Sequence, residues 1–557
     1  MNRLSEAQLK RTLFCAHVVL FSTLFEVLSL HAQETPKASP SPAPVLSPVA
    51  GAKPATPPED SSPLAQAQQL YRVGKFAAAS EQYSTIIKAG VNAGPAYAGL
   101  AHVYLKQGKI SDAYAVARKA VETAPQLATT HIALAEVYFR QGKFPETEHE
   151  LLPLMNSASP DPRALLVLSR VYLAASYNAR AKMLIDRAHA LDPADPDIAR
   201  RWMSTLSPQE RLKALESYLS SETNDDEKER SFLKQEVQDL KNLISQTPRS
   251  CHLTTKIAST QSKLEGLMRD EKHLRGYGLK VVVNGVSSKL LLDTGAGGIL
   301  ITKQIADKAG VKRIVQTEFG GIGNEKAAGG YIGYAESIKV GELEFQNCYV
   351  DVVEKSSRVG GDGLIGADVF SHFLIDLNLV DAKFSLGPLP PLPGEQPNEA
   401  TLDSRGLENK RFHDRYIAPE MKSYTPVYRF GHMLLIPTHL NEGPAKLFLI
   451  DTGGFDNQIS PDAAKEVTKL HSDASFTISG LNGEVKHVMR ADDVTLQFAH
   501  LKQTRHDMFS IDFSDISNSE GTEISGILGF AMLYLIDIRI DYRDGLVDMA
   551  FDPKRWQ

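Results

Sequence analysis

The sequence predicts a multidomain chain of α and β class, in which an all-α solenoid of helical repeats is followed by two all-β units. Three observations support this prediction. A pattern of glycine and aromatic residues recurs every 34 residues in the N-terminal half, an apolar segment ending in Asp-Thr-Gly occurs twice in the C-terminal half, and 557 residues are too many for one domain. The net charge of −6, with mixed signs and no long basic run, argues against a nucleic-acid partner.

The first 32 residues have the composition of an export signal. Arg3, Lys10 and Arg11 precede a mainly apolar run over residues 12–30, and the chain after Ala32 is a candidate cleavage site. The alternative is an uncleaved membrane anchor, because the run approaches the length that spans a bilayer. We therefore expect an exported protein that is periplasmic, on the cell surface or secreted, with membrane contact only through this segment if it is uncleaved. Residues 33–63, rich in Pro, Ala and Ser, are predicted to be a disordered linker.

The helical repeats occupy residues 64–205. Gly74, Gly108 and Gly142 are spaced 34 residues apart, and each is followed by Lys and an apolar residue. The pattern resembles tetratricopeptide repeats, which implies about four helix pairs, the fourth with Ser176 where glycine is expected. Such a stack has a concave groove, which we expect either to support the C-terminal units or to dock a protein partner or substrate. A helical connector is predicted over residues 206–274.

The duplicated segments run from Leu290 to Thr302, which reads LLLDTGAGGILIT, and from Phe448 to Ser460, which reads FLIDTGGFDNQIS. Each is a strand-like apolar run that ends in a carboxylate, which is costly to bury unless it is hydrogen-bonded. The glycine that follows lets the chain turn and bring backbone N–H groups to the acid, and the threonine offers a hydroxyl. Two such carboxylates about 3 Å apart share a proton, so that one acts as a base and the other as an acid.

Two further elements recur around each Asp-Thr-Gly. Gly-apolar-apolar-Gly follows it at 363–366 and at 526–529, and a strand, an Asn-centred turn and a second strand precede it, with the turns at Asn284 and Asn441. Three elements in the same order indicate a duplicated domain. Residues 275–387 and 425–557 accordingly resemble retropepsin-like aspartic protease units of the kind found in bacterial Asp-Thr-Gly protease families, and residues 388–424 are predicted to link them.

The resemblance implies an aspartic endopeptidase that hydrolyses peptide bonds in a peptide or protein substrate through a water activated by an Asp pair, without metal or cofactor. Asp293 and Asp451 would be catalytic and would face each other in one site, so that a monomer contains an internal pseudo-dimer. The residues expected to fix their geometry are Thr294, Gly295, Thr452 and Gly453. The resemblance also implies flap hairpins over the substrate, with candidates at 320–323 and 480–483.

The second copy departs from the family pattern, because Gly454 stands where the first copy has Ala296, and Asp456 adds a carboxylate that either alters the shared proton or faces solvent. One alternative is therefore a non-catalytic, peptide-binding scaffold with degenerate protease-like units. Another is pairing between two chains in a homodimer. Cys251 and Cys348 either form a disulfide or remain free thiols.

Overall fold

The structure is a computed structural model that describes residues 62–157, 159–220, 227–246, 251–268, 271, 274–323, 327–355, 361–394, 413–473, 475–485 and 487–551. The predicted export segment and nearly all of the linker after it lie outside these residues. Among the helices that the structure describes, none combines the length and apolar character that a membrane span requires.

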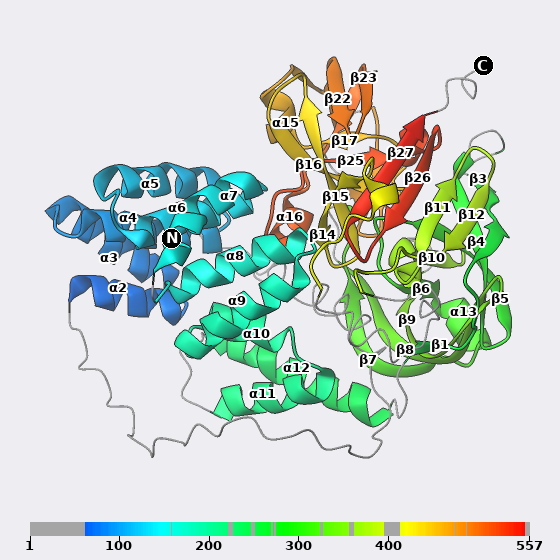
Figure 1. Cartoon of the computed structure of the whole chain (residues 1–557), viewed down its shortest axis with the longest axis horizontal. Coiled ribbons are helices and arrows are strands. Elements are labelled where there is room, and N and C mark those ends of the chain that lie inside the picture. Colours follow the sequence, from blue (N-terminus) through cyan, green and yellow to red (C-terminus); the bar gives the residue numbers. More distant parts are fainter. Residues whose placement is uncertain are drawn as a thin grey trace.

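The N-terminal part of the described chain is a stack of helix pairs (Figure 1), as predicted. The helices of a pair are joined by tight turns at Gly74, Gly108 and Gly142, where φ is 73°, 72° and 70°. In the fourth pair Ser176 takes φ of 60°, so this turn keeps the left-handed backbone without glycine. The pairs are α2 (Pro63–Arg72) with α3 (Phe76–Ala89), α4 (Ala93–Lys106) with α5 (Ile110–Thr123), α6 (Ala128–Arg140) with α7 (Phe144–Leu151), and α8 (Pro162–Ala174) with α9 (Asn178–Leu191).

Three more helices continue the stack. They are α10 (Pro196–Met203), α11 (Pro208–Ser220) and α12 (Glu227–Gln246). Residues 252–268, which the sequence placed in a helical connector, instead form strands that belong to the β part. These strands are only two to four residues long, too short to show a clear periodicity in the sequence, and their pairing with other strands determines their structure.

The first β unit is built on a nine-stranded sheet in the order β1-β9-β6-β10-β5-β4-β8-β7, with β3 paired to β4. Its strands are β1 (His252–Leu253), β3 (Glu265–Met268), β4 (Leu274–Val283), β5 (Val286–Asp293), β6 (Ile299–Thr302), β7 (Lys312–Phe319), β8 (Ala328–Val340), β9 (Leu343–Val353) and β10 (Gly363–Gly366).

The second β unit repeats this plan in a ten-stranded sheet, in which β25 and β16 lie side by side as β10 and β5 do in the first unit. Its strands are β14 (Tyr428–Phe430), β15 (Met433–Leu440), β16 (Ala445–Asp451), β17 (Gln458–Ile459), β18 (Leu470–Ser472), β21 (Met489–Ala491), β22 (Val494–Phe498), β23 (Leu501–Arg505), β24 (Met508–Ser510) and β25 (Gly526–Gly529). A separate two-stranded hairpin consists of β19 (Ile478–Gly480) and β20 (Gly483–Val485).

A six-stranded sheet joins the two units. At its centre β11 of the first unit pairs antiparallel with β26 of the second, with Ile375 opposite Ile540 and Leu377 opposite Ile538. Its strands are β2 (Thr260–Lys263), β11 (Leu374–Asn378), β12 (Lys383–Gly387), β13 (Thr425–Pro426), β26 (Ile536–Asp541) and β27 (Leu546–Phe551). Because one hydrophobic core runs through both units, they form a single body within one chain.

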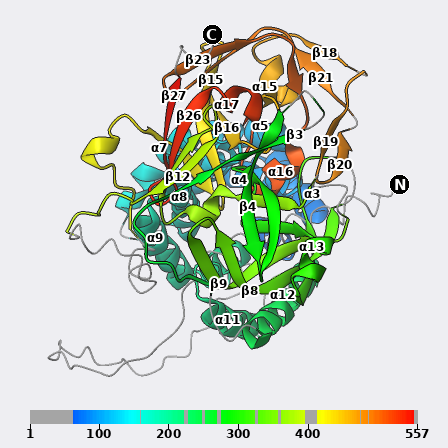
Figure 2. The same cartoon turned by 90° about the vertical axis from the view of Figure 1, so that its right-hand side faces the viewer.

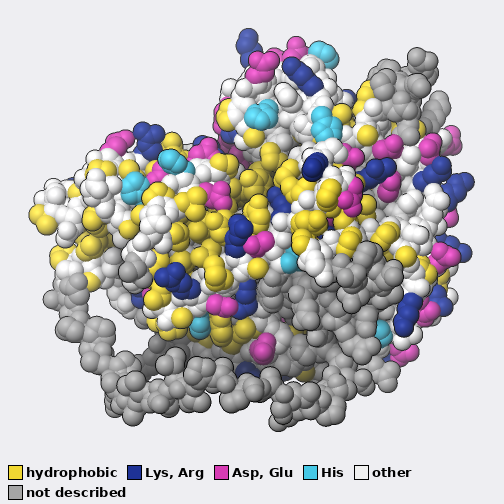
Figure 3. All heavy atoms as spheres, viewed as in Figure 1, with side chains coloured by type: hydrophobic (Ala, Val, Ile, Leu, Met, Phe, Trp, Pro, Cys, Tyr) yellow, Lys and Arg dark blue, Asp and Glu magenta, His cyan; other side chains and the backbone are white. Residues whose placement is uncertain are grey.

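The helices pack directly on the β part. Helices α6 to α9 share a hydrophobic core with the second unit, in which the Phe144 ring contacts the Tyr428 ring edge-on at 4.5 Å between centroids. Helices α10 to α12 share another core with β7, β8 and β9 of the first unit, and α11 and α12 lie beneath β8 and β9 in Figure 2. On the face shown in Figure 3, hydrophobic side chains gather where the helices meet the β part. The helical stack is therefore built into the molecule and is not a separately tethered module.

Candidate active site

The two Asp-Thr-Gly loops begin where the central strands of the two units end. Asp293 is the last residue of β5 and Asp451 is the last residue of β16. Beside each of them runs a Gly-apolar-apolar-Gly strand in parallel, with Gly366 opposite Asp293 and Gly529 opposite Asp451. Each carboxylate thus stands at the end of a buried strand and next to a residue without a side chain.

The threonines of the two loops lock the units together. The Thr294 hydroxyl donates to the Ile450 carbonyl oxygen at 2.8 Å and accepts from the Thr452 N–H at 3.0 Å. Reciprocally, the Thr452 hydroxyl donates to the Leu292 carbonyl oxygen at 2.9 Å and accepts from the Thr294 N–H at 3.1 Å. Both side chains are fully or almost fully buried, so these four hydrogen bonds fix the position of one loop against the other.

Glycine is required in each loop because the aspartate of the other unit lies very close to it. A Cβ atom on Gly453 would lie 2.2 Å from Oδ2 of Asp293, and one on Gly295 would lie 2.7 Å from the carboxyl carbon of Asp451. Each glycine therefore leaves room for the aspartate of the other unit. The Gly295 N–H donates to its own unit's Asp293 at 2.8 Å, and the Gly453 N–H donates to Asp451 at the same distance.

The surroundings raise the pKa of both carboxyls. Burial raises the pKa of Asp293 well above its usual range, and the charge of Asp451 and a hydrogen bond to that carboxyl raise it further. The pKa of Asp451 is also raised by burial, but hydrogen bonds from Gly454 and Gly453 and the one with Asp293 act in the opposite direction. The pair therefore holds one proton between its two carboxyls.

The departure in the second unit does not disturb the pair. Gly454 donates its N–H to Asp451 at 2.9 Å, which adds a stabilising contact to the ionised form. Asp456 turns away and forms an ion pair with Arg505, with Nη2 at 2.8 Å from Oδ1. The extra carboxylate is neutralised by a partner of its own and is not a third member of the acid pair.

The two loops are braced by different residues, which the sequence comparison of the two copies missed. In the first unit Asp368 accepts from the Gly298 N–H at 3.0 Å, and burial raises the pKa of this carboxyl to about 6. In the second unit Ala531 stands in the corresponding place, and Asn457 instead accepts from the Gly529 N–H at 2.9 Å. The second copy has no aspartate after its Gly-apolar-apolar-Gly segment, and this difference between the two copies could have been read from the sequence.

The two predicted flap tips contact each other. The Asn482 N–H donates to the Ile322 carbonyl oxygen at 2.9 Å, and the Cβ atom of Leu481 lies 2.6 Å from the place that a Cβ on Gly321 would occupy. Leu481 also packs against a cluster of the first unit that includes Leu364, two residues before the glycine opposite Asp293. The hairpins of the two units therefore contact each other.

One more side chain at the site escaped the sequence analysis. His432 lies in the turn between β14 and β15 of the second unit, and its Nε2 atom is 3.2 Å from the Gly295 carbonyl oxygen in the first unit. No motif marks this histidine. Within the described residues no group of three or more His, Cys, Asp or Glu side chains is placed to hold a metal ion.

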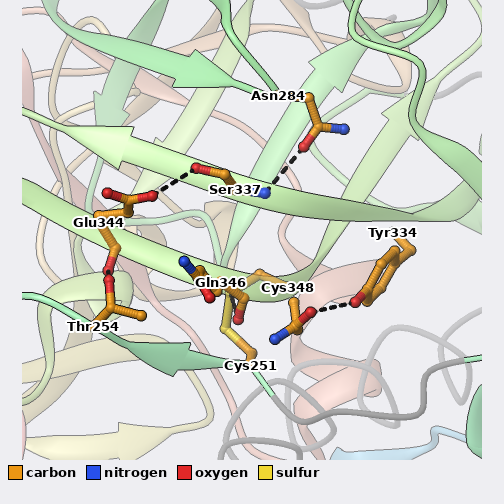
Figure 4. The surroundings of a disulfide bond; sticks show 9 residues. Cys251, Thr254, Asn284, Tyr334, Ser337, Glu344, Gln346 and Cys348 are labelled. Carbon is orange, nitrogen blue, oxygen red and sulfur yellow. Dashed lines mark hydrogen bonds between the residues drawn. A yellow bond between two sulfur atoms is a disulfide. The ribbon is translucent and has the colours of Figure 1, made fainter.

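The cysteines left open by the sequence are joined. A disulfide links Cys251 to Cys348 and so ties the start of the β part to β9 (Figure 4). Next to it, His252 and Leu253 of β1 pair with Gln346 and Phe345 of β9. The bond anchors the segment that connects the helices to the first unit.

Residues 279–369 match the family model described as aspartyl protease. The first β unit is an aspartyl protease-like unit. Among curated proteins, the chain is similar to DNA damage-inducible protein 1 of Chaetomium globosum, with 32% identity over 107 residues. It is likewise similar to the protein of that name from Neurospora crassa, with 31% identity over 103 residues. The matches cover 19% and 18% of this chain and 23% of each relative's length.

Two solved structures are also similar to the chain. One is a thermophilic TPR protein of Thermus thermophilus, with 20% identity, a TM-score of 0.27 and coverage of 32% of this chain and 96% of that one. The other is the aspartic proteinase of Irpex lacteus, with 12% identity, a TM-score of 0.33 and coverage of 53% of this chain and 98% of that one. The family match over residues 279–369 agrees with the resemblance inferred from the sequence for the first β unit.

Proposed function

We propose that the chain is an aspartic endopeptidase whose single active site lies between its two protease-like units. The observation that carries this proposal is the interlocked pair of Asp-Thr-Gly loops, in which each glycine makes room for the other unit's aspartate. A half-buried and a buried carboxyl that share a proton are suited to activate water and to protonate a leaving group. A non-catalytic binding protein has no need of this arrangement.

In the proposed reaction Asp451 is the ionised member and takes a proton from the bound water as the water oxygen attacks the carbonyl carbon of the scissile peptide bond. Asp293, which carries the shared proton, donates it to the carbonyl oxygen. In the second step the C–N bond breaks as Asp451 gives its proton to the leaving nitrogen and a hydroxyl of the intermediate returns a proton to Asp293. A carboxyl group and an amine are released, and the pair regains its starting protonation. The substrate enters when the flap tips at Ile322 and Asn482 separate, because their contact closes the site.

The test is cleavage of a mixed peptide library by the full chain between pH 3 and pH 8. The full chain is needed because α6 to α9 share a hydrophobic core with the second unit. We expect Asp293→Asn and Asp451→Asn each to abolish cleavage, whereas Asp456→Asn, a matched control in the same loop, retains it. Cleavage that survives one of the two substitutions would contradict a shared site, and no cleavage at any pH would favour the peptide-binding alternative.

We further propose that the protein is exported, to the periplasm, the cell surface or the medium. The Cys251–Cys348 disulfide supports this proposal, because disulfides persist in oxidising compartments. Separation of cells into fractions followed by detection of the chain tests it. A reduced protein found in the cytoplasm would contradict it.

For the helical repeats we propose a bracing role together with docking of a protein partner. The shared cores support bracing. A cavity of about 660 Å³ on the helical part, lined among others by Tyr71, His102 and Arg163, is the place we assign to a partner. Affinity capture with the full chain and with a Gln68→Arg variant, which adds bulk and charge at an exposed residue of the cavity lining, tests this role, since a partner bound equally by both would not use the cavity.

A further inference from the structure

His432 of the second unit reaches across to the Asp-Thr-Gly loop of the first. The hairpin of β14 and β15 places it there: Phe430 pairs with Met433, so Gly431 and His432 form a two-residue turn, and Gly431 has φ of 56°. Arg429 holds this turn by donating from Nε to the Gly431 carbonyl oxygen at 2.9 Å. The histidine is therefore held by its own hairpin and not by the loop that it touches.

The imidazole contacts the first loop through both sides of its ring. A carbonyl oxygen can only accept, so the 3.2 Å contact with the Gly295 carbonyl oxygen places the ring proton on Nε2. Nδ1 is buried without a hydrogen-bond partner among the described residues, and a Cβ atom on Gly297 would lie 2.7 Å from it. The absence of a side chain at Gly297 thus lets the ring reach the loop.

The peptide group that His432 touches is also a donor to the acid pair. The carbonyl oxygen of Gly295 and the N–H of Ala296 belong to one peptide. The Gly295 N–H donates to the Asp293 carboxyl at 2.8 Å, and the Ala296 N–H, which donates to the Asp293 backbone carbonyl oxygen at 3.4 Å, faces the same carboxyl and lowers its pKa. Hydrogen bonds in such a chain polarise one another. A donor on the carbonyl side therefore strengthens the N–H that faces Asp293.

We infer that His432 is a positioning residue that holds and polarises the Gly295–Ala296 peptide against Asp293. In the second unit Phe455 stands where the first unit has Gly297. The contact from His432 acts on the loop that carries the carboxyl of the first unit. The inference deepens the proposed function, but it concerns the titration of Asp293 and can be tested without substrate.

Burial and a nearby positive charge both favour the neutral form of His432. Burial lowers the pKa of His432 to about 4, and Arg429 on the same hairpin acts in the same direction. Asp293 and Asp451 lie on the other side of the Gly295 residue that the ring contacts: the Gly295 N–H donates to Asp293, and a Cβ atom on Gly295 would lie 2.7 Å from the carboxyl carbon of Asp451. At pH 5 to 8 the ring is therefore a neutral donor whose charge stays constant while the pair titrates.

Three substitutions of His432 distinguish the effect of its hydrogen bond from the effect of its ring packing. In His432→Gln the amide nitrogen lies near the place of Nε2 and restores the donor. In His432→Asn the amide lies near the place of Nδ1 and falls short of Gly295, and in His432→Phe the ring stays without a donor. The readouts are the pH profile of kcat/KM and, independently of activity, the carboxyl titration of Asp293 followed by carbon NMR.

We expect the Gln variant to keep the wild-type titration. In the Asn and Phe variants the titration of Asp293 and the basic limb of the activity profile move up by about half a pH unit to one unit, because a hydrogen bond that favours the ionised form is weakened. An unchanged titration in the Asn variant would overturn the inference, even if the Phe variant does not fold. If the titration moves but no variant and no wild-type protein cuts peptides, the proposed function fails and the inference about His432 stands.

Discussion

The interlock of Thr294 and Thr452 allows a quantitative prediction. We consider Thr294→Val, which keeps the shape of the side chain and removes its hydroxyl. Two hydrogen bonds are lost, and the buried Ile450 carbonyl and Thr452 N–H are left without partners. A hydrogen bond contributes about 1 kcal/mol and an unpaired buried group costs about 1–3 kcal/mol. The expected loss in free energy of unfolding is therefore about 2–5 kcal/mol.

The assay is urea unfolding followed by circular dichroism, with the change in midpoint multiplied by the denaturant slope. Thr294→Ser is the matched control, because it keeps the hydroxyl, and should lose less than about 1.5 kcal/mol. The double variant with Thr452→Val should cost less than the sum of the two single variants, because the first substitution already loosens the contact between the loops. Equal losses for the Val and Ser variants, or a loss below about 0.5 kcal/mol for Val, would refute the interlock.

Three further outcomes are expected. Gly453→Ala should lower peptide cleavage by roughly a hundredfold or more, because its methyl group would lie 2.2 Å from Asp293 Oδ2 and displace that carboxyl. The control is Gly329→Ala, whose methyl group would meet no atom within 4 Å and which should leave cleavage unchanged. Asp293→Asn should raise the melting temperature at pH 7 and much less at pH 3.5. The pKa of Asp293 is raised in the folded state, so the stability that its protonation contributes is complete below about pH 3.9 and is lost as the pH rises. Asn does not ionise and so does not lose this stability. A melting temperature that is equal to or below that of the wild type at pH 7 would contradict the raised pKa. Phe144→Ala should lower the urea stability by about 3–5 kcal/mol, because the ring is 1% exposed and packs on Tyr428 across the junction of helices and β part; an unchanged midpoint would show that the junction contributes little.

Features that repeat along the chain could be predicted from the sequence. The glycine turns at Gly74, Gly108 and Gly142 mark the helix pairs, and the duplicated Asp-Thr-Gly segments mark the two β units. Both signals arise from local requirements, since a left-handed turn favours glycine and a buried carboxylate needs close backbone donors. Local requirements leave a residue pattern that can be read without knowing the rest of the fold.

Contacts between distant segments left no such pattern. Thr522 donates its hydroxyl to the Phe139 carbonyl oxygen at 2.9 Å and thereby joins the second unit to α6. Cys251 and Cys348 are brought together by strand pairing, and His432 meets Gly295 only because the two units are interlocked. In each case the partner could not be chosen until the tertiary arrangement was known. For the same reason the shared cores between the helices and the β units were not predicted.

The differences between the two units matter for the chemistry. In a symmetric pair of identical units both carboxyls have the same surroundings, and only the position of the proton distinguishes them. In this chain the N–H groups of Gly453 and Gly454 donate to Asp451, whereas the peptide that follows Gly295 beside Asp293 is held by His432. The duplication therefore permits each carboxyl to have a pKa of its own. Under the proposed function, the two carboxyls therefore meet a substrate in different surroundings, and exchanging their roles as acid and base would require changes in both loops.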